Sequence, residues 1–297
     1  MSGKIEKLTY VNERGESIVF SPASSFHVNF KDVSGLSDIR NAIYSINSMG
    51  QDGDTYLGNR IESRDIEIVG YFKERNKERA QAMRRRMNHI LNPQYEATLI
   101  YEYDDYKRVI GCKVDNAPVF KREPIFEQFT IQLLCLNPFW REEAETREDI
   151  ATWTGGFEFP VPDGLEIPIE GWEIGFREPS LIVNVYNDGD VVSGIRIDFR
   201  ALGVVSNPSL LNVNTQQYIR LNLEMEAGDV LTVSTGYGEK AVTLNRNGVI
   251  TDAFRYLDVD SSYLQLSVGD NLFRYDADGN LENLEVSIYH NNLYLGV

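Results

Sequence analysis

The chain has 297 residues, of which 42% are hydrophobic and 25% are charged, and its formal net charge at pH 7 is −16. That apolar content can build packed cores, so the composition excludes wholesale disorder, and the length favours two domains. Phosphate contacts need clustered Lys and Arg, so the acidity disfavours a free nucleic-acid-binding protein. Residues 1–7 include no apolar stretch of signal-peptide length, and the longer apolar runs are too short to cross a membrane. Two cysteines without a signal sequence favour cytoplasmic synthesis with reduced thiols.

The first half of the chain is predicted to form an α+β domain. Its apolar residues alternate with polar ones, and this period of two predicts strands at 4–10, 18–20, 64–72, 97–103, 108–114 and 126–136. A glycine-bearing connection at 12–16 favours a hairpin between the first two strands. Strands with one packed helix make an α+β domain.

The helix of this half is predicted at residues 75–91. Apolar side chains recur there at spacings of three and four, which is typical of an amphipathic helix, and Pro93 follows its end. Arg84, Arg85 and Arg86 could contact nucleic acid, but consecutive helix residues point in three directions. A solvated or salt-bridged helix face is therefore the favoured interpretation.

The second half of the chain carries most of the negative charge and shows no helical period. A charged, polar stretch at 141–149 favours a connector, so we expect domains at 1–145 and 146–297, the alternative being a long surface loop within one domain. Short alternating strands are predicted at 181–185, 195–199, 219–225 and 284–288, with turns at 187–190, 245–248 and 276–280. This spacing is typical of a jelly-roll β-sandwich.

No metal-binding or redox motif is recognisable in the sequence. His27, His89 and His290 do not have the spacing of metal ligands. Cys112 and Cys135 lie in separate predicted strands and form no Cys-x-x-Cys motif. The two thiols could meet if their strands are neighbours, but buried, reduced cysteines are the favoured interpretation.

No catalytic motif is recognisable either. The acidic pairs Asp104–Asp105 and Glu142–Glu143 show no sign of the two unequal carboxylates that a glycosidase needs. In Asp276–Asn280 the glycine stands at the wrong position for a calcium loop, so a hairpin turn is favoured. We therefore predict a protein that is not an enzyme, without cofactor and without catalytic, cofactor-binding or metal-ligating residues.

Large aromatic residues gather at the start of the second domain. They are Trp153, Phe157, Phe159, Trp172, Phe176 and Tyr186. Aromatic faces can stack on sugar rings, so an alternative function is binding of cell-wall saccharide by the C-terminal sandwich. Such residues more often anchor cores or interfaces.

A series of short motifs recurs along nearly the whole chain. The motifs are Leu8–Asn12, Gly15–Ile18, Gly50–Gly58, Arg64–Gly70, Leu91–Pro93, Gly111–Val114, Asn137–Trp140, Asn187–Asp190, Asn207–Pro208, Val268–Asn271 and Tyr294–Val297. In their order and spacing they resemble the distal tail proteins (Dit) of siphophages, especially those of phages and prophages of Gram-positive bacteria.

The resemblance implies a mainly β protein of two domains. An N-terminal belt domain, made of β-sheets or a split barrel with one helix, is expected to assemble six copies into a ring. The C-terminal domain is expected to be a β-sandwich like those of galectins or carbohydrate modules. Such a hexameric hub would lie at the tail tip of the virion, in the baseplate. There it would join the tail tube protein to the tail-tip and receptor-binding proteins around a channel for DNA, with no sequence-specific nucleic-acid contact and no membrane insertion.

Ring assembly needs exposed edges and loops that neighbouring copies complete. Residues 45–59 are predicted to form a polar, glycine-rich loop that nevertheless carries Met49, Tyr56 and Leu57. Apolar anchors on a loop of this length indicate a contact surface for a partner, and the alternative is a flexible surface loop.

Overall fold

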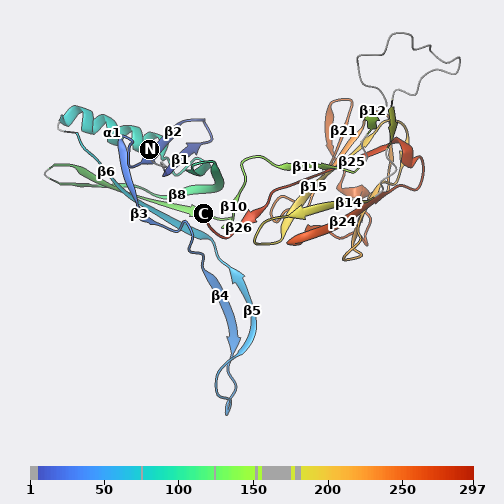
Figure 1. Ribbon diagram of the computed structural model, residues 1–297, viewed down its shortest axis with the longest axis horizontal. Coiled ribbons are helices and arrows are strands. Elements are labelled where there is room, and N and C mark those ends of the chain that lie inside the picture. Colours follow the sequence, from blue (N-terminus) through green and yellow to red (C-terminus); the bar gives the residue numbers. More distant parts are fainter. Residues whose placement is uncertain (1–5, 75, 124, 151–152, 156–174, 178–181) are drawn as a thin grey trace, which may run out of the picture. The chain divides into compact units, whose positions relative to one another are not determined.

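The computed structural model divides into two compact units, Met1–Glu143 with Leu293–Val297 and Ala144–Asn292. It describes residues 6–74, 76–123, 125–150, 153–155, 175–177 and 182–297. The chain is mainly β, with a single α-helix among these residues (Figure 1). The domain boundaries 1–145 and 146–297 stay a prediction. Residues 293–297, which we assigned to the second domain, group with the first unit.

The strands of the first unit form one large sheet and one separate hairpin. They are β1 (Glu6–Asn12), β2 (Ser17–Ser21), β3 (Phe26–Ser34), β4 (Asn41–Ile46), β5 (Thr55–Ile61), β6 (Arg64–Phe72), β7 (Ala97–Tyr103), β8 (Tyr106–Arg122), β9 (Glu127–Cys135), β10 (Trp140–Arg141) and β26 (Leu293–Tyr294). The sheet order is β26-β10-β8-β7-β1-β2-β3-β6-β9, and β4 pairs with β5. Every strand predicted from alternation in this half is present.

The large sheet closes on itself, because β8 pairs with β9 as well as with β7. Neighbouring copies are therefore not needed to complete the barrel. Alternate residues of each strand point inward, as in β9, where Phe129, Ile131 and Leu133 are buried. The ring of Phe129 packs against that of Phe20, with 5.9 Å between the ring centroids, so strands far apart in the sequence share one core.

The predicted helix is confirmed as α1 (Lys77–Ile90). Asn76 caps its start, because the side-chain Oδ1 accepts hydrogen bonds from the backbone N–H groups of Glu78 and Arg79. Met87 and Ile90 are buried on the face that packs against the barrel. None of the described helices is long and apolar enough to span a membrane.

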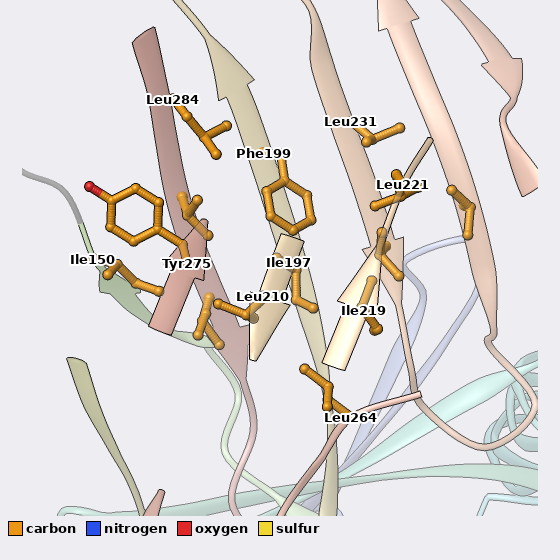
Figure 2. Packing of buried hydrophobic residues seen from close by; sticks show 14 of the residues in the cluster. Ile150, Ile197, Phe199, Leu210, Ile219, Leu221, Leu231, Leu264, Tyr275 and Leu284 are labelled. Carbon is orange, nitrogen blue, oxygen red and sulfur yellow. The ribbon is translucent and has the colours of Figure 1, made fainter. Parts of the chain in front are cut away.

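The second unit consists of short strands and two 3₁₀ turns, η1 (Phe254–Tyr256) and η2 (Leu281–Asn283). Its strands are β11 (Thr146–Asp149), β12 (Trp153–Gly155), β13 (Gly175–Arg177), β14 (Ile182–Asn187), β15 (Ser193–Ala201), β16 (Val205–Ser206), β17 (Ser209–Asn212), β18 (Tyr218–Arg220), β19 (Glu224–Met225), β20 (Val230–Ser234), β21 (Ala241–Arg246), β22 (Val249–Asp252), β23 (Gln265–Leu266), β24 (Gly269–Asp276) and β25 (Leu284–His290). Two larger sheets, β11-β25-β15-β20-β21-β22 and β14-β24-β17-β18, form a sandwich. Figure 2 shows Ile197 and Phe199 of β15 among Leu210 and Ile219, which come from the other sheet.

Two local predictions in this unit are corrected. Residues 219–225 do not form one strand: they are divided between β18 and β19, because the backbone N–H of Asn222 donates to the carbonyl of Tyr256 instead of continuing a ladder. The turn at 276–280 is not a hairpin, because it leads from β24 in one sheet to β25 in the other. The predicted hairpin at 245–248 is confirmed, with Asn247 and Gly248 in the left-handed region between β21 and β22.

Candidate functional site

β4 and β5 form a hairpin that extends from the barrel of the first unit (Figure 1). The predicted loop at 45–59 is therefore too long: residues 47–54 connect the strands, whereas residues 45–46 end β4 and residues 55–59 belong to β5. A bulge at Leu57 shifts the register between the Tyr44–Gly58 and Ser45–Tyr56 pairs. The bulge interrupts the period of two, which hid these strands from the sequence patterns.

Both faces of this hairpin carry large apolar side chains. Because cross-strand partners share a face, Ile43 and Tyr56 lie on one side and Tyr44 and Ile46 on the other. Together with Leu57, these side chains are between 51% and 66% exposed. Contiguous exposed apolar side chains mark interaction sites, and an isolated two-stranded ribbon is only marginally stable in water. The hairpin therefore has the properties of a contact surface for another protein.

The base of the hairpin is held by the guanidinium of Arg64, the first residue of β6, which is only 2% exposed. Arg64 donates to the backbone carbonyls of Gly35 at 2.8 Å, Leu36 at 2.9 Å and Pro138 at 2.8 Å, and also to that of Leu295. Burial lowers the pKa of the guanidinium. Its charge is stabilised mainly by carbonyl dipoles from three separate segments.

Further contacts tighten the same junction. Trp140 donates from Nε1 to the carbonyl of Leu36 at 3.0 Å, and Ser37 donates from Oγ to the carbonyl of Val297 at 2.8 Å. Gly35 lies at a φ of +85°, and a Cβ atom there would be 2.0 Å from the carbonyl oxygen of Asp65. The segment leading into the hairpin is therefore fixed against β6 and residues 293–297.

The sequence patterns did not reveal this junction. In the sequence Arg64 looks like any charged residue at the start of a strand. Its partners are backbone carbonyls, which every residue has, so the residue types at those positions do not reveal the contacts. The available signals were Gly35 and the glycine of Tyr294–Val297, each of which packs closely against backbone.

The three histidines do not come together as a metal site. His89 Nε2 lies 3.1 Å from Glu16 Oε1, the ring of His27 packs 4.4 Å from that of Tyr71, and His290 is buried in β25 of the second unit. In the part of the chain that the structure describes, no group of three His, Cys, Asp or Glu side chains could hold a metal ion.

The two cysteines and the acidic pair Glu142–Glu143 take part in the packing and hydrogen bonding of the first unit. Cys112 and Cys135 are free and buried on the neighbouring strands β8 and β9. Burial raises the pKa of the Cys135 thiol to about 12, so it stays protonated. Glu142 accepts a hydrogen bond from the hydroxyl of Tyr294 at 3.0 Å, and Glu143 pairs with Lys107 at 2.6 Å.

The three arginines of α1 separate as the helical geometry requires. Arg84 pairs with the buried Glu127 of β9, with 2.9 Å between Nη2 and Oε1. Arg85 and Arg86 are exposed on other sides of the helix. The arrangement matches a helix face that is partly salt-bridged and partly solvated.

The predicted aromatic cluster falls mostly outside the described residues. That holds for Phe157, Phe159 and Trp172 and for the side chains of Trp153 and Phe176. Tyr186 lies on β14 with 56% of its surface exposed.

Comparisons with known proteins show which family this chain belongs to. The family model for the phage tail protein RIFT-related domain matches residues 14–135, and that for the siphovirus-type tail component, C-terminal domain (SPP1_Dit), matches residues 188–294. The chain belongs to the distal tail protein family of siphophages. The protein is a structural hub or baseplate component of phage tails. Members of this family are not typically enzymes.

Solved structures of distal tail and baseplate proteins share the fold. The Dit protein (gp 19.1) of phage SPP1, described as a paradigm of the hub adsorption apparatus in phages that infect Gram-positive bacteria, superimposes with a TM-score of 0.68 at 14% identity. The match covers 96% of this chain and 98% of the SPP1 protein. A chain of the phage P2 baseplate in its activated conformation with Ca matches with a TM-score of 0.54 at 11% identity, over 97% and 98% of the two chains. No curated protein sequence is significantly similar to the chain.

Proposed function

We propose that this distal tail protein forms a hexameric ring in the virion, which joins the tail tube protein to the tail-tip and receptor-binding proteins around a channel for DNA. The observation that carries the proposal is the β4–β5 hairpin, whose exposed apolar side chains on both faces need a partner. A ribbon that is apolar on two sides can contact a partner with either face, and contacts between unlike surfaces of successive copies generate closed rings.

The first unit supports assembly through its outer surface rather than through strand exchange. Its barrel is closed by the β8–β9 pairing, so a neighbouring copy would pack against the barrel instead of adding a strand to it. The first half of the chain, which would form the ring, is close to neutral, and a wall without a large excess of Lys and Arg does not hold passing DNA by phosphate contacts.

Negative-stain microscopy tests the proposal on the purified protein and on its complex with the tail-tip protein. We expect rings with six-fold symmetry in at least one of the two samples. Monomers alone in the first sample are compatible with ring closure that needs the partner. Strictly monomeric particles in both samples would contradict the proposal.

The alternative role of the aromatic cluster at residues 153–186 in binding cell-wall saccharide stays a prediction. Only the exposed ring of Tyr186 can be placed. Binding to host cell walls that is lost on Trp172→Ala, with the fold intact, would favour it. Zymography on host peptidoglycan tests the further expectation that the protein is not a hydrolase, and we expect no clearing.

A further inference from the structure

The second unit has a shallow polar groove of about 250 Å³ on the outer face of its larger sheet. The groove is lined mainly by Arg147, Asp198, Arg200, Glu285, Ser287 and Tyr289. These residues come from β11, β15 and β25, and the intervening residues Ile197, Phe199 and Val286 point to the opposite side, into the core. The groove is therefore a built feature of the sheet and not a gap between loops.

Several of the lining side chains are held in place by hydrogen bonds to neighbouring side chains on the same face of the sheet. Arg147 donates from Nε to Asp149 Oδ1 at 2.8 Å, and Ser287 donates from Oγ to the same oxygen at 2.6 Å. Asp198 accepts from Thr232 Oγ1 at 2.8 Å and from Arg196 Nη1 at 3.2 Å. These bonds fix the polar atoms before any ligand arrives, which lowers the entropy lost on binding.

The ring of Tyr289 is held by its cross-strand partner Arg196 on the same face of the sheet. The guanidinium of Arg196 lies 3.9 Å from the centroid of this ring and also donates to Glu145 Oε2 at 2.7 Å. Tyr289 therefore forms a fixed wall of the groove.

Two charged side chains in the groove are left with unused hydrogen-bonding capacity. Arg200 of β15 and Glu285 of β25 are opposite each other in the strand register. Neither side chain has a hydrogen bond or an ion pair with any residue that the structure describes. Their charged groups are therefore available to a ligand, whereas those of Arg147 and Asp198 are already oriented by the protein.

The chemistry of the groove favours a small, neutral ligand with several hydroxyl groups. Arg147 and Arg200 balance Asp198 and Glu285, so the lining has no net charge to attract an anion or a cation. A carboxylate accepts from two hydroxyls, and a guanidinium donates to two oxygens in a fixed fork. Pockets for drug-sized ligands span roughly 300–1,000 Å³, so this groove has room for about one ring.

We propose that this groove binds a neutral sugar ring, with Glu285 accepting from and Arg200 donating to vicinal hydroxyl groups of the sugar. The lining of the site includes none of the aromatic residues named between 153 and 186 and lies entirely within the second unit. The proposal does not depend on ring assembly, because no residue of the hairpin takes part.

Titration of the full chain with D-galactose, D-glucose, N-acetyl-D-glucosamine and L-rhamnose, followed by saturation-transfer NMR and calorimetry, tests the site. We expect saturable binding of at least one of these sugars. Arg200→Met and Glu285→Gln should each weaken it by about tenfold or more, because each removes a charge-assisted hydrogen bond. Arg274→Met, on an exposed position of β24 in the other sheet, is the matched control and should bind as the unchanged protein does.

Three results would overturn the proposal. One is the absence of saturable binding by all four sugars. Another is binding that survives both Arg200→Met and Glu285→Gln. The third is binding that Arg274→Met weakens as much as Arg200→Met does. Melting temperatures of the three variants show that each remains folded, and ring assembly is scored separately by microscopy.

Discussion

The buried guanidinium of Arg64 donates a hydrogen bond to the backbone carbonyl of Leu295, 231 residues further along the chain. The same guanidinium binds the carbonyls of Gly35 and Leu36, which precede the β4–β5 hairpin. One side chain thus joins the start of the hairpin, the start of β6 and the segment that returns after the second unit. The predictions on the first unit follow from this junction and from the hairpin that it supports.

Replacing Arg64 by methionine should destabilise the first unit strongly. The methionine fills a similar volume but removes the Arg64 donor from the carbonyls of Gly35, Pro138 and Leu295. The carbonyl of Leu36 keeps its hydrogen bond from Trp140 Nε1. We expect a loss of about 2–4 kcal/mol in the free energy of unfolding, measured by denaturant titration. Arg60→Met, at an exposed position of β5, is the control and should change it by less than about 0.5 kcal/mol. Equal effects of the two substitutions would contradict the role of Arg64.

Deleting Leu293–Val297 should loosen the base of the hairpin. The deletion removes the β26–β10 pairs and one acceptor of Arg64. We expect faster amide hydrogen exchange in residues 35–38 and 138–141. Deleting Val297 alone, which removes the acceptor of the Ser37 hydroxyl and one partly buried side chain but leaves the β26–β10 pairs and Leu295, should have a smaller effect. Unchanged exchange after the longer deletion would refute the prediction.

Replacing exposed apolar side chains of the β4–β5 hairpin should abolish ring assembly without destabilising the monomer. Tyr44→Ser combined with Ile46→Ser removes two exposed apolar side chains from one face. The unfolding free energy of the monomer should change by no more than about 0.5 kcal/mol per position, since both side chains are in contact with water. Rings seen by negative-stain microscopy should be lost. Val259→Ser, at a nearly fully exposed position of the second unit, should leave assembly intact.

Two glycines with the same φ should respond differently to alanine. Gly35 and Gly50 both have a φ of +85°, but only at Gly35 would a Cβ atom collide with backbone. Gly50→Ala should destabilise by about 1–2 kcal/mol, the usual cost of placing a residue with a Cβ atom at a positive φ. Gly35→Ala must also displace β6, so we expect a clearly larger loss in thermal unfolding. A smaller loss at Gly35 than at Gly50 would show that the junction is not tightly packed.

The second unit should lose stability in acid through Asp229. Burial by itself raises the pKa of this carboxyl, but hydrogen bonds from Arg246 and from the backbone N–H of Glu226 outweigh it and lower the pKa below its usual 3.8. A lowered pKa in the folded state stabilises the protein above the pKa of the unfolded state, and this contribution is lost as the pH falls through the folded value. The stability advantage of the unchanged protein over Asp229→Asn should therefore be full at pH 7 and shrink below about pH 4. An advantage that is constant down to pH 2 would disprove this linkage.

Local patterns determined much of the fold. The alternation in β6 and β9, the spacing of Met87 and Ile90 in α1 and the Asn247–Gly248 turn are properties of neighbouring residues, so the sequence by itself predicted them. The ordered motifs along the chain were likewise enough to identify the distal tail family, which two family models confirm. Interrupted patterns failed, as in β4 and β5, where a bulge breaks the period of two.

Only the tertiary structure decided which distant segments meet. The closure of the barrel by β8 and β9, the pairing of β26 with β10 and the carbonyls around Arg64 depend on backbone groups, which every residue carries alike. The groove around Arg200 and Glu285 depends on the register of separate strands, and no spacing along the chain encodes it. The sequence therefore determined the elements and the family, whereas the pairing of those elements determined the hairpin junction and the groove.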